Sequence, residues 1–253
     1  MAEVPLYDQF AAGYDLMTDW EARLKSEAGF LRQLFDSFQV RSVLDAACGT
    51  GQHAMEFARW GLEVTGTDLS QPMIDRGRAN AGTLAVRFLV AGLGEHREKA
   101  PGPYDAVTCL GNSLPHLLDG AALDDALDDF RGVLRPGGVL LLQNNNYDAI
   151  LSQKRRFMGV ASREVQGTEY LFFRFIDLGP ESITFHIVTF VKTAGSWSFS
   201  EDSTPQRAVL QGDLIPRLAR LGFRDITLFG DFLGSGFDET ASPNMVVVAR
   251  APG

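Results

Sequence analysis

The chain has 253 residues and a formal net charge of -9, and 45% of its side chains are hydrophobic while 22% are charged. These proportions are typical of a globular protein, and the length fits one large α/β domain or one domain with an inserted subdomain. The acidic balance argues against nucleic acid as a partner, because negative surface charge repels the phosphate backbone. Two cysteines are too few for a disulfide framework, so we expect a cytoplasmic protein.

The sequence also lacks the usual signs of a membrane protein. No apolar run approaches the roughly 18 residues that a membrane-spanning helix needs. The first ten residues, MAEVPLYDQF, do not contain the basic and apolar segments of an export signal. We therefore expect neither a membrane anchor nor a membrane partner.

Short apolar runs alternate with amphipathic segments from residue 40 onward. Apolar runs of this kind, separated by helices, are typical of strands buried in a parallel sheet. Gly61 matches a helix end, and Ser70 matches the N-cap of the next helix. Five strand-helix units in succession predict a doubly wound sheet. The predicted strands are 40–46, 62–68, 86–90, 104–110 and 139–145, and the predicted helices include 53–60 and 123–134.

This pattern breaks after residue 157, where Phe, Ile, Val, Thr and Arg become frequent. Two long strand-like runs, 169–178 and 182–192, are separated by GPE and predict an antiparallel pair. Helical periodicity resumes at Asp213 and strands follow at 223–229 and 245–249, so the antiparallel segment interrupts the sheet domain. We predict an N-terminal helical lid over 1–38, a doubly wound seven-stranded Rossmann-like α/β domain over 39–153 and 208–253, and an antiparallel β-rich insertion over 154–207 that covers the active site.

The segment VLDAACGTGQHA joins the first strand to its helix and predicts a ligand-binding loop. Gly49 and Gly51 allow a ligand to approach the backbone at the positive end of the helix. With Ala54 they also match the G-x-G-x-x-G/A pattern, so the glycines alone fit either a nicotinamide enzyme or an S-adenosylmethionine enzyme. Asp68, at the end of the second strand, can accept hydrogen bonds from the ribose of either cofactor. Asp45 would repel a pyrophosphate but attract a cationic amino group, which favours S-adenosylmethionine.

Several longer segments carry a resemblance that covers nearly the whole chain. They are VLDAACGTG, VTGTDLS, YDAVTCLGNSLPHL, VLRPGGVLLLQNNNYDAIL, the β-rich insertion and GDF at 230–232. In them the sequence resembles the class I S-adenosylmethionine-dependent methyltransferases, and within these the glycine and sarcosine N-methyltransferase group. The resemblance implies S-adenosyl-L-methionine as cofactor, S-adenosyl-L-homocysteine as product, and methyl transfer to a small-molecule acceptor. An amine acceptor is favoured, with O-methylation as the alternative.

The resemblance also implies a set of cofactor residues. Ala47, Gly49 and Gly51 are expected at the methionine portion, Asp68 at the ribose, and Leu69, Gly92 and Leu93 at the adenine. Arg23 aligns with an arginine that reaches the cofactor carboxylate, and Tyr14 and Trp20 are lid aromatics. The remaining candidates for cofactor binding are Asp45, His53, Met73, Leu110 and His116.

The acceptor side is expected to contain Asn112 and Tyr147 as catalytic residues that orient the acceptor. Methyl transfer to a neutral amine needs little acid or base help, so we expect proximity, orientation and exclusion of water to dominate. In the glycine-methylating members, the position of Asn145 carries an arginine that binds the substrate carboxylate. An amide cannot replace that bidentate ion pair, so we predict that glycine is a poor substrate. If the insertion supplies a substitute cation, the nearest candidates are Arg155, Arg156 and Arg174.

Other interpretations remain compatible with the sequence. An NAD(P)-dependent oxidoreductase fits the glycine pattern, and a non-catalytic module that binds the cofactor fits all the motifs. His53 is equally explained as a helix cap, and His116 as a core histidine. The chain has four histidines without the spacing of metal ligands, so we predict no metal site.

Overall fold

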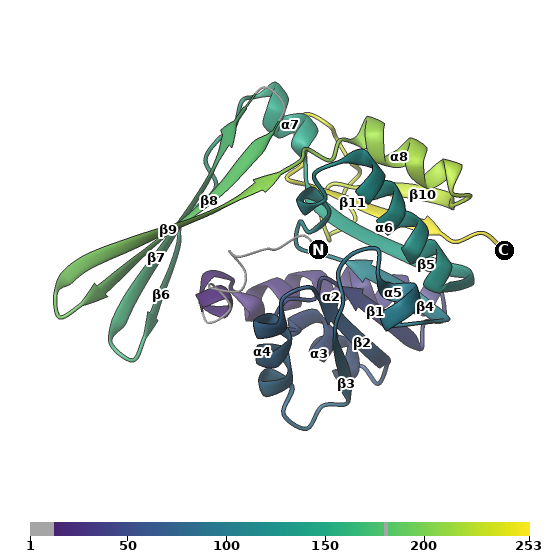
Figure 1. Ribbon diagram of the computed structural model, residues 1–253, viewed down its shortest axis with the longest axis horizontal. Coiled ribbons are helices and arrows are strands. Elements are labelled where there is room, and N and C mark those ends of the chain that lie inside the picture. The colour runs from purple at the N-terminus through teal and green to yellow at the C-terminus, as the bar shows by residue number, and fades with distance from the viewer. Residues whose placement is uncertain (1–12, 180–181) are drawn as a thin grey trace.

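The central sheet contains seven strands in the order β10-β11-β5-β4-β1-β2-β3 (Figure 1). The computed structural model describes residues 13–179 and 182–253. Neighbouring strands are parallel except at β11, which runs antiparallel to β5 and β10. The doubly wound seven-stranded sheet expected from the sequence is therefore confirmed. Its strands are β1 (Ser42–Ala46), β2 (Glu63–Asp68), β3 (Val86–Val90), β4 (Tyr104–Cys109), β5 (Leu134–Asn145), β10 (Arg224–Phe229) and β11 (Asn244–Arg250).

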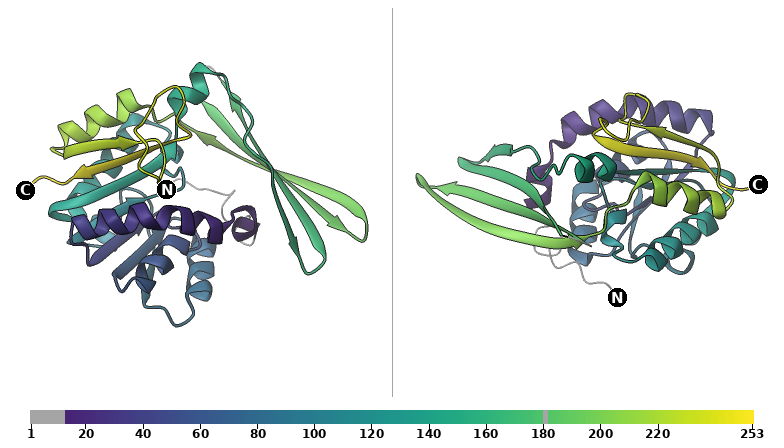
Figure 2. Two further views of the ribbon diagram at one scale, coloured as in Figure 1. Left: turned by 180° about the vertical axis from the view of Figure 1, so that it is seen from behind. Right: turned by 90° about the horizontal axis from the view of Figure 1, so that it is seen from above.

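Helices cover both faces of this sheet (Figure 2). They are α2 (Trp20–Ser37), α3 (Gln52–Arg59), α4 (Gln71–Ala81), α5 (His96–Lys99), α6 (Gly120–Val133), α7 (Tyr147–Ser152) and α8 (Gln211–Arg220), with a 3-10 turn η1 (Leu114–His116). α2, α3 and α4 pack on one face, and α6 and α8 pack on the other. Alternate residues of a strand point to opposite faces of the sheet. Val43 of β1 therefore packs in the core beneath α2, α3 and α4, and Leu44 packs in the core beneath α6 and α8; both are 0% exposed. None of the helices in the described part of the chain is long and apolar enough to cross a membrane.

The start of α4 shows how the local sequence positions the loops at the carboxyl ends of the strands. The hydroxyl of Ser70 accepts a hydrogen bond of 3.3 Å from the backbone N–H of Met73, which is the N-cap geometry predicted from the sequence. Pro72 lies in the first turn, where its missing N–H costs nothing. The helix therefore begins immediately after the carboxyl end of β2 and fixes the loop between them.

A second, antiparallel sheet extends from the body beside the carboxyl end of β5 (Figure 1). Its strands β6 (Ala161–Val165), β7 (Thr168–Leu178), β8 (Ile183–Thr193) and β9 (Ser196–Gln206) are paired in that order, as the sequence predicted for an inserted antiparallel segment. Phe172 of β7 and Ile187 of β8 pack against Met17. The predicted lid includes residues 1–12, which lie outside the described residues, whereas 13–17 are helical. One face of the second sheet is therefore anchored against the N-terminal segment.

A buried carboxylate joins α5 to α6. Asp129 is 3% exposed, and its two oxygens accept hydrogen bonds from the backbone N–H groups of His96 (2.8 Å) and Arg97 (2.9 Å). The Nδ1 atom of His96 lies 2.7 Å from the same carboxylate. Burial raises the pKa of Asp129, but these hydrogen bonds outweigh burial and hold that pKa below its ordinary value. The carboxylate therefore stabilises the fold in its ionised form.

Replacing this carboxylate by an amide tests its contribution to stability. We expect Asp129→Asn to lower the free energy of unfolding at pH 7 by about 1–3 kcal/mol, because an amide nitrogen would face backbone N–H donors. Since the folded pKa is depressed, the stabilisation is present above the unfolded pKa of about 3.9 and is lost as the pH falls through the folded pKa. Urea unfolding at pH 7 and at lower pH should show the wild type and Asp129→Asn converging. The exposed Asp125→Asn on the same helix is the matched control; an equal loss in both variants would contradict the assignment.

Candidate functional site

Two cavities adjoin at the carboxyl ends of the parallel strands. The larger cavity has a volume of about 320 Å³ and lies where β1, β2, β3 and β4 end. The second, which we call the amide cavity, has a volume of about 270 Å³ and lies between the central sheet, the N-terminal segment and the second sheet. Tyr14 and Gly111 line both cavities, so they form the boundary between them. Ligands of doubly wound sheets bind at this edge, where the strand order reverses.

The larger cavity brings together most of the predicted cofactor residues. Leucine and methionine side chains form one part of its wall, and the strand-end loops form the rest. It is lined by Tyr14, Ala47, Gly49, Asp68, Leu69, Met73, Gly92, Leu93, Leu110 and His116, together with Ala91, Glu95, Gly111, Ser113 and Leu117. The sequence did not single out Glu95, whose carboxylate accepts a hydrogen bond of 2.8 Å from the N–H of Gly92. Its position three residues after that glycine is the only signal that would have found it.

Asp68 connects the glycine loop to the start of α4. One carboxylate oxygen accepts a hydrogen bond from the N–H of Gly49 and the other accepts one from the N–H of Ser70, each 2.9 Å long. A carboxylate has about four lone-pair sites, so it retains the capacity to accept bonds from the hydroxyl groups of a ligand. Asp68 is only partly buried and lines the larger cavity. It can therefore hold the loop and bind a ligand at the same time.

Gly51 has a structural role that differs from the expected one. Its φ angle is +77°, and a Cβ atom there would lie 2.5 Å from the Phe88 ring. It lines neither cavity. Gly49, with φ +56°, faces the Tyr14 ring and does line the larger cavity. The two glycines thus have separate tasks, since Gly51 packs the loop on β3 and Gly49 presents backbone to the cavity.

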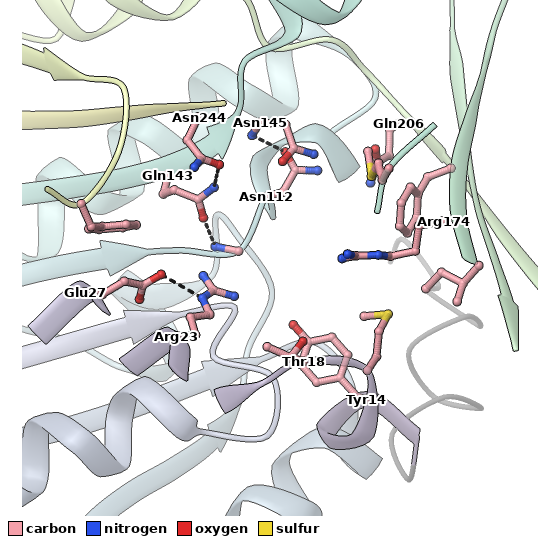
Figure 3. Close-up of a pocket in the computed structure, with 16 residues that line it drawn as sticks. Tyr14, Thr18, Arg23, Glu27, Asn112, Gln143, Asn145, Arg174, Gln206 and Asn244 are labelled. Atoms are coloured by element: carbon pink, nitrogen blue, oxygen red, sulfur yellow. Dashed lines mark hydrogen bonds and ion pairs between the residues drawn. The ribbon is translucent and has the colours of Figure 1, made fainter. Parts of the chain in front are cut away.

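Arg23 and Glu27 belong to a network at one end of the amide cavity (Figure 3). Glu27 accepts a hydrogen bond of 2.9 Å from Nε of Arg23 and lies 2.7 Å from Nε2 of His53. Burial raises the pKa of Glu27, but His53 and Arg23 outweigh burial and hold that pKa below its ordinary value. The Trp20 ring contacts both the Arg23 guanidinium and the edge of His53. Glu27 is therefore an ionised counterion with both oxygens occupied.

Besides Gly51, three of the predicted cofactor residues lie outside both cavities. Trp20 and His53 support Arg23 and Glu27 instead of lining a wall. Asp45 is 2% exposed and accepts a hydrogen bond of 2.7 Å from the hydroxyl of Thr108. Burial raises the pKa of Asp45. These side chains form the layer beneath the site, because strand and helix packing covers them.

Five side-chain amides line the amide cavity (Figure 3). They are Asn112, Gln143, Asn145, Gln206 and Asn244. Antiparallel pairing places Asn244 of β11 directly opposite Asn145 of β5. Gln143 donates to Asn244 (3.0 Å) and accepts from the N–H of Gly111 (2.7 Å). The orientations of Gln143 and Asn244 are thus fixed by their neighbours, and the amides present both donors and acceptors to the cavity.

Tyr147 lies behind this wall and not on it. It is 0% exposed, its hydroxyl accepts from Nδ2 of Asn112 (3.0 Å), and it donates to Oε1 of Gln206 (2.9 Å). Burial raises the pKa of Tyr147 to about 12, so the phenol stays protonated at neutral pH. The expected contact of Asn112 with the amide cavity is present, whereas Tyr147 acts by holding Asn112 and Gln206.

The sequence did not predict Gln143, Gln206 or Asn244 at this site. Gln143 begins the polar run QNNN at the end of an otherwise apolar strand, and this change of character was a usable signal. Gln206 and Asn244 have no comparable signal. They reach the cavity because β9 and β11 return to the carboxyl end of β5.

Comparisons with known proteins find similarity to methyltransferases. A family model described as a methyltransferase domain matches residues 43–138. A glycine/sarcosine N-methyltransferase from Parasynechococcus marenigrum (strain WH8102) is 32% identical over 230 residues, covering 89% of this chain and 78% of the relative. The methyltransferase CcbJ from Streptomyces caelestis has a TM-score of 0.77 at 24% identity, over 100% of both chains. The S-adenosylmethionine-bound amino pentose methyltransferase CalS10 from Micromonospora echinaspora has a TM-score of 0.69 at 18% identity, over 92% of this chain and 97% of that one.

The double role of Asp68 gives a direct test. We expect Asp68→Asn to weaken binding of S-adenosylmethionine by about 10- to 100-fold, because hydrogen bonds to a charged acceptor contribute about 1.5–3 kcal/mol. Titration calorimetry with S-adenosylmethionine and S-adenosylhomocysteine measures the affinity, and thermal unfolding shows whether the loop still folds. Asp75→Asn changes an exposed carboxylate of α4 that lines neither cavity and serves as the control. Unchanged affinity in Asp68→Asn would contradict the assignment.

Proposed function

This chain belongs to the S-adenosylmethionine-dependent methyltransferases, in the family of the glycine/sarcosine N-methyltransferases, and we propose that it methylates a nitrogen atom of a small acceptor bound in the amide cavity. The single observation that carries the proposal is the position of this cavity. It meets the larger cavity at Tyr14 and Gly111, so a methyl donor in one can face an acceptor in the other.

The larger cavity suits the cofactor in its shape and chemistry. Asp68 would hold the ribose hydroxyls, and Leu69 and Leu93 would lie against the adenine. Ala47 and Gly49 would border the methionine portion, and Arg23 would approach its carboxylate from the adjoining cavity. When bound, S-adenosylmethionine supplies an electrophilic methyl group on a sulfonium. The chain's own contribution is to hold donor and acceptor in line and to exclude water.

The absence of a suitable base favours nitrogen over oxygen as the methylated atom. A neutral amine has a lone pair ready, whereas a hydroxyl must lose a proton to a general base. Among the described residues of the amide cavity wall there is no histidine, and its carboxylate, Glu27, is held by Arg23 and His53. His116 lines the larger cavity, and burial lowers its pKa to about 4, which makes it a weak base. The site is thus suited to an amine.

The second sheet and the N-terminal segment would keep water from the acceptor. Met17 and Thr18 line the amide cavity from one side, and Met158, Phe185 and Ile187 line it from the other. Removing water strengthens the electrostatic interactions within the cavity and protects the methyl donor. We also propose a cytoplasmic location and no nucleic-acid partner, supported by the free cysteines Cys48 and Cys109 and the net charge of -9.

An acceptor screen tests the proposed reaction. Purified protein with methyl-labelled S-adenosylmethionine should methylate members of a panel of primary and secondary amines and leave matched hydroxyl compounds unchanged. Release of S-adenosylhomocysteine and mass spectrometry of the products report turnover. Methylation confined to the hydroxyl compounds would indicate an O-methyltransferase. Tight cofactor binding without turnover of any amine would indicate a non-catalytic module, and either result would contradict the proposal.

Tyr147 provides a second test, of acceptor positioning. Tyr147→Phe keeps the buried ring but removes the hydroxyl that joins Asn112 to Gln206. We expect kcat/KM for the acceptor to fall by about tenfold, which corresponds to about 1.4 kcal/mol and to the loss of one or two hydrogen bonds. Affinity for S-adenosylmethionine should change less than twofold. If the role of Tyr147 were purely structural, Tyr147→Phe would instead lower the melting temperature and weaken the binding of both acceptor and cofactor.

A further inference from the structure

Arg174 occupies an unusual place for a charged side chain. It lies in the middle of β7, where residues two apart share a face of the strand. Its neighbours on that face, Phe172 and Ile176, are both 0% exposed, and its partner across the pair on β8 is Ile187. The guanidinium extends from this apolar face into the amide cavity (Figure 3).

The other arginine and lysine side chains in the strands of the second sheet have carboxylate partners, as does Arg156 just before them. Arg156 pairs with Asp177, Arg163 with Asp19, and Lys192 with Glu169. Arg174 has no ion-pair partner among the described residues, and its buried Nε atom has no hydrogen-bond acceptor there. Among the described arginine and lysine residues of the second sheet's strands, Arg174 is therefore the one whose charge is unmatched.

The walls of the cavity do not supply the missing negative charge. Glu27 is occupied by Arg23 and His53. Tyr14 lines the same cavity, but burial raises the pKa of Tyr14 and keeps its hydroxyl neutral. Burial also disfavours the charged form of Arg174 and lowers its pKa. Arg174 is partly buried. A cation partly removed from water without a counterion is destabilised, and a carboxylate that binds its guanidinium through two parallel hydrogen bonds would offset that cost.

We propose that Arg174 binds a carboxylate of the acceptor, which makes the substrate an amine that carries a carboxylate group. The inference rests on the proposed N-methylation and adds the acceptor class and the residue that selects it. Binding from β7 would place the carboxylate beside the second sheet, whereas Asn145, the position at which the resemblance implies an arginine in glycine-methylating members, lies at the end of β5. Arg155 is exposed and lines neither cavity, and Arg156 is paired with Asp177. Of the three candidate cations, Arg174 alone lines the amide cavity.

The experiment compares acceptors that differ only in charge. Amines with a carboxylate, namely glycine, sarcosine and β-alanine, are each paired with the corresponding neutral amide. Arg174→Met retains an apolar stem of similar length and removes the charge. For the best carboxylate-bearing acceptor we expect kcat/KM to fall by about 100-fold, mostly through KM, because a charged bidentate contact is lost. Turnover of the neutral amides should change less than threefold.

Two further variants separate a specific contact from a general effect. Lys192→Met removes a cation from the same sheet, at a position outside the cavities, and should leave all acceptors unaffected. Asn145→Arg, introduced into Arg174→Met, moves a guanidinium to the β5 side and should restore turnover of the smallest carboxylate-bearing acceptors. Equal turnover of acids and amides by the wild type, or equal loss of both in Arg174→Met, would overturn the inference.

A binding measurement distinguishes failure of this inference from failure of the proposed reaction. Calorimetric titration of acetate into the protein saturated with S-adenosylhomocysteine should show binding in the wild type and none in Arg174→Met. If acetate binds in this way but no amine is methylated, the proposed reaction is wrong while the carboxylate site stands. If amines are methylated and acetate binds equally well to the wild type and to Arg174→Met, the carboxylate assignment is wrong. Loss of affinity for S-adenosylmethionine itself in Arg174→Met would show that the guanidinium binds the cofactor, and this result would also overturn the carboxylate assignment.

Discussion

The geometry of the site depends on the carboxylate of Asp68 at the end of β2. Its hydrogen bonds to Gly49 and Ser70 hold two neighbouring loops against each other. One loop begins α3 and the other begins α4, so a single side chain determines where both helices start relative to the strand ends. The larger cavity is the space that these loops leave, and the amide cavity can adjoin it at Tyr14 and Gly111 only while they hold this shape.

The two arginines that line the amide cavity differ in how their charge is balanced. Arg23 is neutralised within the chain, because Glu27 binds it and His53 binds Glu27 in turn. Arg174, across the amide cavity, has no such arrangement among the described residues. The remaining polar side chains of that cavity are the hydroxyl residues Tyr14 and Thr18 and five neutral amides, of which Gln143 hydrogen-bonds to Asn244. A cavity of this composition orients a polar acceptor without protonating or deprotonating it, which suits a reaction controlled by position.

The sequence predicted the fold, and most of the residues it proposed for the cofactor line one cavity, because these signals are local. Buried parallel strands require near-continuous apolar runs, and the loops after them require residues such as Gly49 and Asp68 at fixed spacing. The same locality limits what a motif can predict. Asp45 and His53 follow the expected spacing, but tertiary packing covers both, and a sequence motif does not reveal which residues form the cavity wall and which lie beneath it.

The residues of the amide cavity were harder to predict. They depend on which face of a strand a side chain occupies and on pairing between strands that are far apart in the sequence. In EYLFFRFIDL apolar residues occupy both alternating sets, so the pattern does not reveal which face of β7 carries Arg174. Arg174 lines the amide cavity, whereas Arg155 and Arg156, the two other candidate cations, do not. Gln206 and Asn244 are far from Asn145 in sequence and reach it through the return of β9 and β11.

The central claim is that methyl transfer occurs to nitrogen. The most direct measurement uses S-adenosylmethionine with a ¹³C-labelled methyl group and a mixture of ¹⁵N-labelled amines, with the product examined by nuclear magnetic resonance. The account predicts a product methyl carbon with a one-bond coupling to ¹⁵N, formed in step with S-adenosylhomocysteine. A labelled methyl group attached to oxygen, or cofactor that stays bound and unconsumed in the presence of every amine, would contradict it.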